Sequence, residues 1–127
     1  MNIISIMKAL GDETRLRILN LLNKDELCVC EVEHLLNINQ SNASRHLNKL
    51  SNSGLVKYRK NALYVYYMIN NDALVQFPFL RMLLGVETAK IPQCREDVSM
   101  LCNYKANGLT CEDLKNGKVC FKDIKEE

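Results

Sequence analysis

The sequence has no long hydrophobic run: none approaches the ~20 apolar residues that a membrane-spanning helix needs. No basic region precedes the first apolar residues, so we expect no signal peptide and a cytoplasmic protein with reduced thiols. Glycine and proline are scarce, at five and two residues, as is ordinary for a globular chain. These absences exclude a membrane partner and leave one compact domain with a short appended tail.

Acidic residues are absent from Gln40 to Asn61. Five basic residues fall inside this segment: Arg45, Lys49, Lys57, Arg59 and Lys60. A basic patch on a weakly charged protein is typical of a nucleic-acid contact. The alternative, a solvated surface face, is normally interspersed with acids.

The sequence also lacks a C-x-x-C motif and any βαβ pattern, which excludes a thiol oxidoreductase, and we expect no enzyme activity. It nevertheless holds six cysteines, which in a cytosolic chain indicate metal or redox chemistry. Cys28 and Cys30 are one residue apart, and the others are Cys94, Cys102, Cys111 and Cys120. The alternative is that some of them are small buried hydrophobes.

Apolar periodicity predicts a mainly α fold. A short helix covers about residues 3–10, and a second begins at Gly11 or Asp12 and ends at 23–25. A third begins near Cys28 or Val29 and includes Leu36, and a turn over 37–40 follows. Ser41 is the predicted N-cap of a fourth helix, which ends at Gly54.

The fourth helix has the composition of a helix that enters a DNA groove. Ala43, Leu47 and Leu50 follow the i, i+4, i+7 pattern of a buried face. Small and polar residues on its first turn allow close approach to base edges. The candidate DNA contacts on this segment are Gln40, Ser41, Asn42, Ser44, Arg45, His46 and Lys49. We assign base readout to Asn42, Ser44 and Arg45, and expect His46 to pack or bind a phosphate rather than read a base.

Residues 55–69 predict a β-hairpin wing. Residues 55–59 form one strand, 60–62 the connection, and 63–69 the alternating partner strand. Arg59 and Lys60 at the tip complete the candidate DNA contacts, because they would reach phosphates or the minor groove. Ala62 stands where a glycine is expected, which predicts a longer or differently shaped turn.

The C-terminal half is predicted to form two further helices. One runs from Ala73 to about Lys90 behind an Asn71-Asp72 cap, with Pro78 restricting its first half. The other covers about 94–105, after a break at Ile91-Pro92. The 73–90 helix and the first helix are too apolar for one small domain to bury, which predicts a homodimer. We therefore divide the chain into a DNA-binding and dimerisation domain (1–90) and a cysteine-containing extension (91–127).

Three motifs together carry a resemblance. The segment 10–19 (LGDETRLRIL) resembles the second helix of the ArsR/SmtB family of metalloregulators. The segment 26–31 (ELCVCE) resembles the metalloid box of that family. The segment 40–50 (QSNASRHLNKL), followed by 54–56 (GLV), resembles its recognition helix. The resemblance implies a winged helix-turn-helix that dimerises through its N- and C-terminal helices. It implies a homodimeric repressor that needs no cofactor to bind operator DNA and leaves it when a metal or metalloid binds.

The resemblance also indicates the inducer. The cysteine box is similar to that of sensors of arsenite and antimonite, As(III) and Sb(III), which makes Cys28 and Cys30 the expected ligands. It is also similar to that of cadmium and lead sensors, which complete their site with N-terminal cysteines, and no cysteine precedes Cys28. Zinc and cobalt members use a histidine on the last helix, and residues 73–90 contain none. A redox-responsive repressor is a further alternative.

As(III) favours a third thiolate. Where arsenite sensors carry one, this sequence has Glu33, a hard ligand that suits As(III) poorly. The third ligand could be a tail cysteine, a cellular thiol or water, and the candidate tail cysteines are Cys94, Cys102, Cys111 and Cys120. These four cysteines could instead form a separate soft-metal site or have no metal role.

The spacing of the pair predicts how it couples to DNA binding. Residues two apart on an α-helix point about 200° from each other, so Cys28 and Cys30 cannot both hold one ion within regular helix. The start of the third helix must stay unwound or be unwound by the ion. Either would shift the recognition helix.

Overall fold

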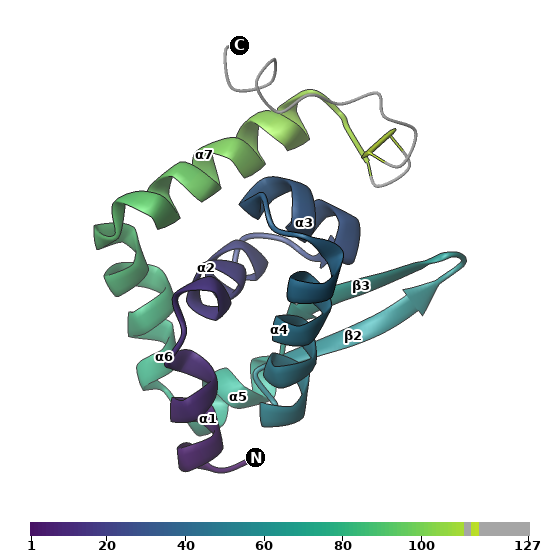
Figure 1. The fold of residues 1–127 in the computed structure, drawn as a ribbon. Coiled ribbons are helices and arrows are strands. Elements are labelled where there is room, and N and C mark those ends of the chain that lie inside the picture. Colours follow the sequence, from purple (N-terminus) through teal and green to yellow (C-terminus); the bar gives the residue numbers. More distant parts are fainter. Residues whose placement is uncertain (111–112, 115–127) are drawn as a thin grey trace.

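The computed structural model describes residues 1–110 and 113–114. The helices cluster together, and the β2–β3 hairpin projects away from them (Figure 1). The elements in chain order are α1 (Ile3–Leu10), α2 (Glu13–Leu22), β1 (Leu27–Cys28), α3 (Val29–Leu36), α4 (Gln40–Ser53), β2 (Val56–Asn61), β3 (Tyr64–Ile69), α5 (Asn71–Gln76), α6 (Phe79–Met82), the π-helix η1 (Leu83–Glu87), the 3₁₀ helix η2 (Thr88–Lys90) and α7 (Pro92–Ala106). The predicted fold class, a mainly α winged helix-turn-helix, is confirmed.

Helix α2 occupies the centre of the core. Asp12, one of the two predicted starting residues, caps it by accepting the Arg15 N–H at 3.0 Å. Ile18, Leu19 and Leu21 are completely buried. Helices α1, α3, α4 and α7 all contact α2, which fixes their relative positions.

Helices α3 and α4 form the helix-turn-helix. Asn37 ends α3 in the left-handed region, at φ 55°. The predicted N-cap Ser41 is wrong, because Asn39 caps α4 by accepting the Asn42 N–H at 2.8 Å. The inward face is confirmed, since Ala43, Leu47 and Leu50 are completely buried.

The wing contains a strand that periodicity does not reveal. β1 has two residues and pairs with β3, giving the antiparallel order β1-β3-β2. β2 extends to Asn61, which pairs with Tyr64 across a two-residue turn. Ala62 makes this turn in the left-handed conformation, at φ 56°, so the turn is not longer than in a tight hairpin. Arg59 and Lys60 consequently lie on the strand and not at the tip, which corrects their predicted position.

The predicted continuous helix over 73–90 is wrong. The segment begins at the N-cap Asn70 and breaks around Pro78 into α5, α6, η1 and η2. The predicted helix at 94–105 is confirmed as α7, which begins at Pro92 and ends before Gly108. Helix α7 contacts α2 and α3 and buries Leu101 and Tyr104 in the same core. Within the part of the chain that is described, no helix is long and apolar enough to cross a membrane.

Candidate nucleic-acid interface and cysteine pair

The outer face of α4 presents most of the predicted DNA contacts to solvent. The exposed ones are Gln40, Ser41, Asn42, Arg45 and Lys49, and Ser44 is half-buried. One guanidinium nitrogen of Arg45 donates to the Asn42 Oδ1 at 3.3 Å, one turn away on the helix. These two side chains are therefore held together on the face that the sequence assigns to base edges.

His46 points inward and is only 5% exposed. Its Nδ1 lies 3.4 Å from Arg15 Nη1, and its Nε2 lies 3.4 Å from Arg45 Nη2. Burial lowers the pKa of His46, and although Asp12 opposes this, the charges of Arg45 and Arg15 add to it. A neutral ring suits the position between two guanidiniums. This placement favours the packing role expected for His46 over a direct contact with DNA.

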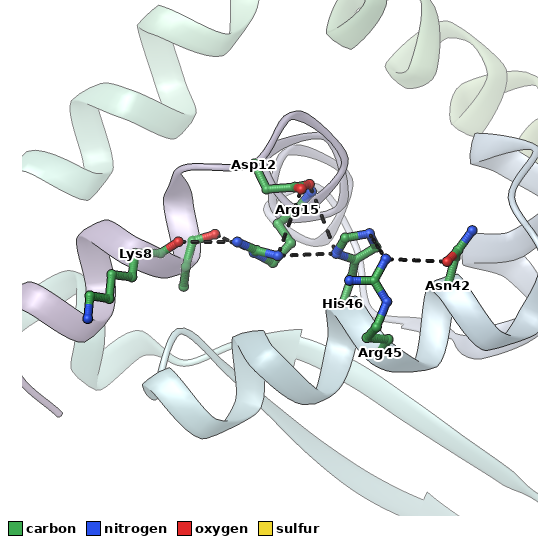
Figure 2. A network of polar contacts seen from close by, with 7 residues as sticks. Lys8, Asp12, Arg15, Asn42, Arg45 and His46 are labelled. Carbon is green, nitrogen blue, oxygen red and sulfur yellow. Dashed lines mark hydrogen bonds and ion pairs between the residues drawn. The ribbon is translucent and has the colours of Figure 1, made fainter.

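Arg15 ties the recognition helix to the N-terminal helices (Figure 2). Its Nε donates to the carbonyl oxygen of Ala9 at 2.7 Å, and its Nη2 donates to that of Lys8 at 3.2 Å. The chain of contacts runs from α1 through Arg15, His46 and Arg45 to Asn42, on the face of α4 predicted to contact DNA. Sequence reasoning did not assign this role to Arg15.

The wing carries its basic residues on β2. Lys57 and Lys60 are exposed. Arg59 instead forms an ion pair with Glu26, and its guanidinium lies 5.0 Å from the centre of the Tyr66 ring. Because Glu26 lies two residues before Cys28, this ion pair joins the wing to the segment that leads into the cysteine pair.

Cys28 and Cys30 converge at the start of α3. Cys28 is the N-cap residue, with extended backbone at φ −85° and ψ 167°, and Cys30 lies in the first turn. Their Sγ atoms are 2.9 Å apart, and Cys28 itself is disulfide-bonded in this structure. The extended Cys28 removes the 200° divergence of a regular helix, so the pair converges without unwinding α3. Of the two arrangements that the spacing allows, the structure has the unwound start.

The cysteine pair opens into a cavity of about 200 Å³. Three elements line it: the start of α3, the first residue of α4 and the tip of the wing. The lining residues are Cys28, Val29, Cys30, Glu33, Gln40, Leu63, Tyr64 and Val65. An ion held by the two sulfurs would therefore lie beside both DNA-binding elements.

The chain is similar in sequence to known proteins. The protein family described as "bacterial regulatory protein, arsR family" matches residues 12–58 of this chain. The cadmium resistance transcriptional regulatory protein CadC homolog of Staphylococcus aureus is 37% identical over 92 residues, which are 72% of this chain and 76% of that protein. The arsenical resistance operon repressor of Staphylococcus xylosus is 37% identical over 114 residues, 90% of this chain and 92% of that repressor. The chain belongs to the arsR family.

A solved structure agrees with this assignment. The homodimeric winged helix-turn-helix DNA-binding domain Mb0332 of Mycobacterium bovis has a TM-score of 0.58 and 30% identity, covering 65% of this chain and 78% of that one. The protein is thus an arsR-family transcriptional regulator and not an enzyme.

The arsR-family match ends at residue 58, but Glu31, which follows Cys30, has a partner beyond it on α7. Glu31 is 4% exposed and accepts the Cys28 N–H at 3.0 Å with Oε1. Its Oε2 accepts the hydroxyl proton of Tyr104. Burial, with the neighbouring Glu31 carboxylate, raises the pKa of Tyr104 far above its ordinary value. Sequence reasoning missed this link, and only the acidic residue at the third helix position was a signal for a cap.

The remaining cysteines of this arsR-family protein lie elsewhere. Cys94 is buried near the start of α7, where burial raises the pKa of its thiol, and Cys102 is exposed on the same helix. Cys111 and Cys120 lie outside the described residues. Over residues 1–110 and 113–114, no three or more Cys, His, Asp or Glu side chains gather as a metal site. Neither Cys94 nor Cys102 therefore completes a three-ligand set with the pair in this structure.

Proposed function

We propose that the protein is a cytoplasmic, homodimeric repressor that binds operator DNA and releases it when As(III) or Sb(III) binds the reduced sulfurs of Cys28 and Cys30. The observation that carries this proposal is the convergence of the two sulfurs, 2.9 Å apart, in a cavity shared by α3, α4 and the wing. Thiolates are soft ligands and select soft ions.

The chemistry of the pair favours a thiophilic inducer over a hard cation. Glu33 lines the cavity but is a hard ligand, so we propose that a third sulfur comes from Cys111 or Cys120, or from a cellular thiol. The likeness to the arsenical resistance repressor extends over 114 residues, against 92 for the CadC homolog, and this supports As(III) as the first inducer to test.

DNA binding is proposed to use the exposed face of α4 and the wing. Asn42, Ser44 and Arg45 would read bases, while Gln40, Ser41 and Lys49 would bind the backbone. Arg59 and Lys60 would reach phosphates from the wing. His46 would act indirectly, by holding Arg45.

We further propose that a second copy of the chain covers the exposed apolar faces of α1 and of the α5–η1 segment. Ile4 and Met7 on α1 are 61% and 53% exposed, and Val75 and Met82 are 70% and 59% exposed. Exposed apolar surface on this scale marks an association site. Sedimentation equilibrium should give a dimer, and Ile4→Glu with Met7→Glu should give a monomer. A wild-type monomer at micromolar concentration would contradict this part.

Ion capture is coupled to DNA release through the walls of the cavity. Gln40 begins the recognition helix, and Leu63 and Tyr64 belong to the wing tip. A bound ion with its ligands would occupy the space between these two elements and so change their relative position. Release requires that the ion bind the DNA-free form more tightly, by a coupling of about 1–3 kcal/mol in typical cases.

The test is fluorescence anisotropy with a labelled operator duplex, first selected by the protein from a random DNA pool. Under reducing conditions, arsenite should lower the anisotropy of the wild-type complex. Cys28→Ser and Cys30→Ser should keep DNA binding and lose the response, whereas the exposed Cys102→Ser should behave as wild type. An intact arsenite response in both serine variants at the pair would overturn the proposal.

Two alternatives share the same fold. Likeness to the CadC homolog favours a cadmium or lead response, and the closeness of the two sulfurs favours a redox response. Cadmium, lead and peroxide arms in the anisotropy assay separate them, and mass spectrometry of the peroxide-treated protein would identify the oxidised cysteine.

A further inference from the structure

The link between Glu31 and Tyr104 is not used by the proposed function. Glu31 is buried at 4% exposure, and each of its carboxylate oxygens has a partner on a different element. Oε1 accepts from the main chain at the β1–α3 junction, and Oε2 accepts from α7. A buried carboxylate is costly unless hydrogen bonds satisfy it, so both partners constrain where it lies.

Glu31 in turn constrains the cysteine pair. The N–H that it accepts belongs to Cys28, whose extended backbone brings its Sγ to that of Cys30. If this hydrogen bond were lost, the main-chain N–H of the N-cap residue Cys28 would lose its contact with the Glu31 carboxylate. Cys28 is also paired with Tyr66 on β3 and is disulfide-bonded in this structure. In the reduced protein the disulfide is absent, so the Glu31 carboxylate and the pairing with β3 are the contacts that hold the Cys28 main chain.

Helix α7 supplies a rigid support for that carboxylate. Arg17 donates to both carboxylate oxygens of Asp97, at 2.8 and 2.9 Å. Asn20 Nδ2 donates to the main-chain oxygen of Cys94 at 3.1 Å. Because these contacts fix α7 to α2, the completely buried Tyr104 presents its hydroxyl to Glu31 from a fixed place.

We propose that Tyr104 is a positioning residue for the thiol pair and acts through Glu31. The inference rests on the proposed function, because it assumes that the two thiols bind a trivalent arsenical. Tyr104 would raise the affinity of the pair for that ligand. A dithiol site binds such a ligand more tightly when both sulfurs are held at the required separation beforehand. Tyr104 and Glu31 supply that preorganisation from α7, which lies beyond the family match.

Phenylarsine oxide is the probe, because its arsenic takes two thiolates and needs no third ligand from the protein. Its affinity for the reduced full-length chain would be measured by competition with a small dithiol, together with the near-ultraviolet absorption of the arsenic–sulfur bonds. Tyr104→Phe, which removes only the hydroxyl, should weaken binding by about tenfold or more, as loss of an outer hydrogen bond does at metal sites. It should also shift the absorption band.

Asp97→Asn is the matched control on α7. It weakens the attachment to Arg17 without touching Glu31, so it should lower the thermal midpoint while leaving the arsenical affinity within about twofold. If Asp97→Asn and Tyr104→Phe weaken binding equally at the same loss of thermal midpoint, Tyr104 only stabilises the fold and the inference is overturned.

Variants of Glu31 keep the test decisive if Tyr104→Phe does not fold. Glu31→Gln keeps an acceptor for the Cys28 N–H and a polar group for Tyr104, so it should retain affinity within a few-fold. Glu31→Ala removes both contacts and should weaken binding by about tenfold or more. Equal affinities for the glutamine and alanine variants would overturn the inference.

The failure of this inference differs from the failure of the proposed function. If Tyr104→Phe weakens capture of phenylarsine oxide but arsenite never releases operator DNA from the wild type, the positioning role stands and the inducer assignment falls. If arsenite releases DNA through Cys28 and Cys30 but the Tyr104 and Glu31 variants bind the probe as wild type, only the positioning role falls.

Discussion

Helices α4 and α7 both pack on α2, but they are held by different forces. The inward face of α4 is aliphatic except for His46 and Ser53, and its polar residues point to solvent. The inward face of α7 includes Asp97 and Tyr104, each bound to one defined partner on another helix. Apolar burial is not directional, whereas these hydrogen bonds are. The position of α4 therefore depends on how well its apolar side chains fill the core. The position of α7 depends on the placement of the few atoms that form its hydrogen bonds.

The largest expected effect is on α4. Leu47→Ala removes a completely buried side chain and should lower the free energy of unfolding by about 2–5 kcal/mol through lost burial and a cavity. Urea denaturation followed by circular dichroism measures it. The exposed neighbour substitution Asn48→Ala is the control and should stay within about 0.5 kcal/mol of wild type. A similar loss in both variants would contradict the packing described for α4.

On α7, Asp97→Ala should cost about 2 kcal/mol of unfolding free energy, because it leaves the Arg17 guanidinium part-buried without its acceptor. Glu87→Ala breaks an ion pair whose side chains are 67% and 49% exposed, and should cost less than about 1 kcal/mol. Thermal and urea denaturation of the two variants compare a buried ion pair with a surface one. Equal costs would show that α7 is not held by its polar contacts.

The DNA face of α4 is expected to act through charge. Lys49→Ala should weaken binding to all sequences by a similar factor and flatten the salt dependence by about one unit of log K against log salt. Anisotropy titrations over a range of salt concentrations give the slope. Lys90→Ala, on η2, is the control, and a slope unchanged by Lys49→Ala would remove Lys49 from the interface.

The smallest effect concerns His46, the directional exception on α4. Its pKa is lowered by burial, so the folded protein binds fewer protons than the unfolded chain. Stability should therefore fall as the pH drops below about 6.5, the ordinary histidine pKa, and be fully present above it. His46→Gln should reduce this loss between about pH 7 and pH 5, measured by urea denaturation at each pH. An unchanged pH profile would show that the ring is not held neutral.

Much of the fold could be predicted because its signals are local. The Asp12 cap, the buried Leu47 and the hairpin depend on neighbours within a few residues. The helix-turn-helix and the cysteine pair were found in this way, and the family assignment followed from their combination.

The features that could not be predicted depend on contacts between residues far apart in the sequence, or on very short secondary-structure elements. Tyr104 meets Glu31 across 73 positions of sequence, and no periodicity records that distance. β1 has two residues, too few for an alternating pattern. Asn39 competes with Ser41 as an N-cap, and both are good caps, so the tertiary position of the turn decides. Pro78 indicated strain in the helix over 73–90 but not that the helix would end there.

The two-residue strand β1 anchors the wing near its middle, so a small rotation at β1 produces a larger displacement at the wing tip. Cys28 is paired with Tyr66 in the middle of β3, and Ala62 at the tip lies four residues before Tyr66 in the chain, about 13 Å away at strand spacing. A tilt of about 10° at that anchor sweeps the tip through roughly 2 Å, more than the tolerance of a hydrogen bond to a phosphate. A displacement too small to disturb the core at Cys28 is thus enlarged at the wing tip, which we propose lies against DNA.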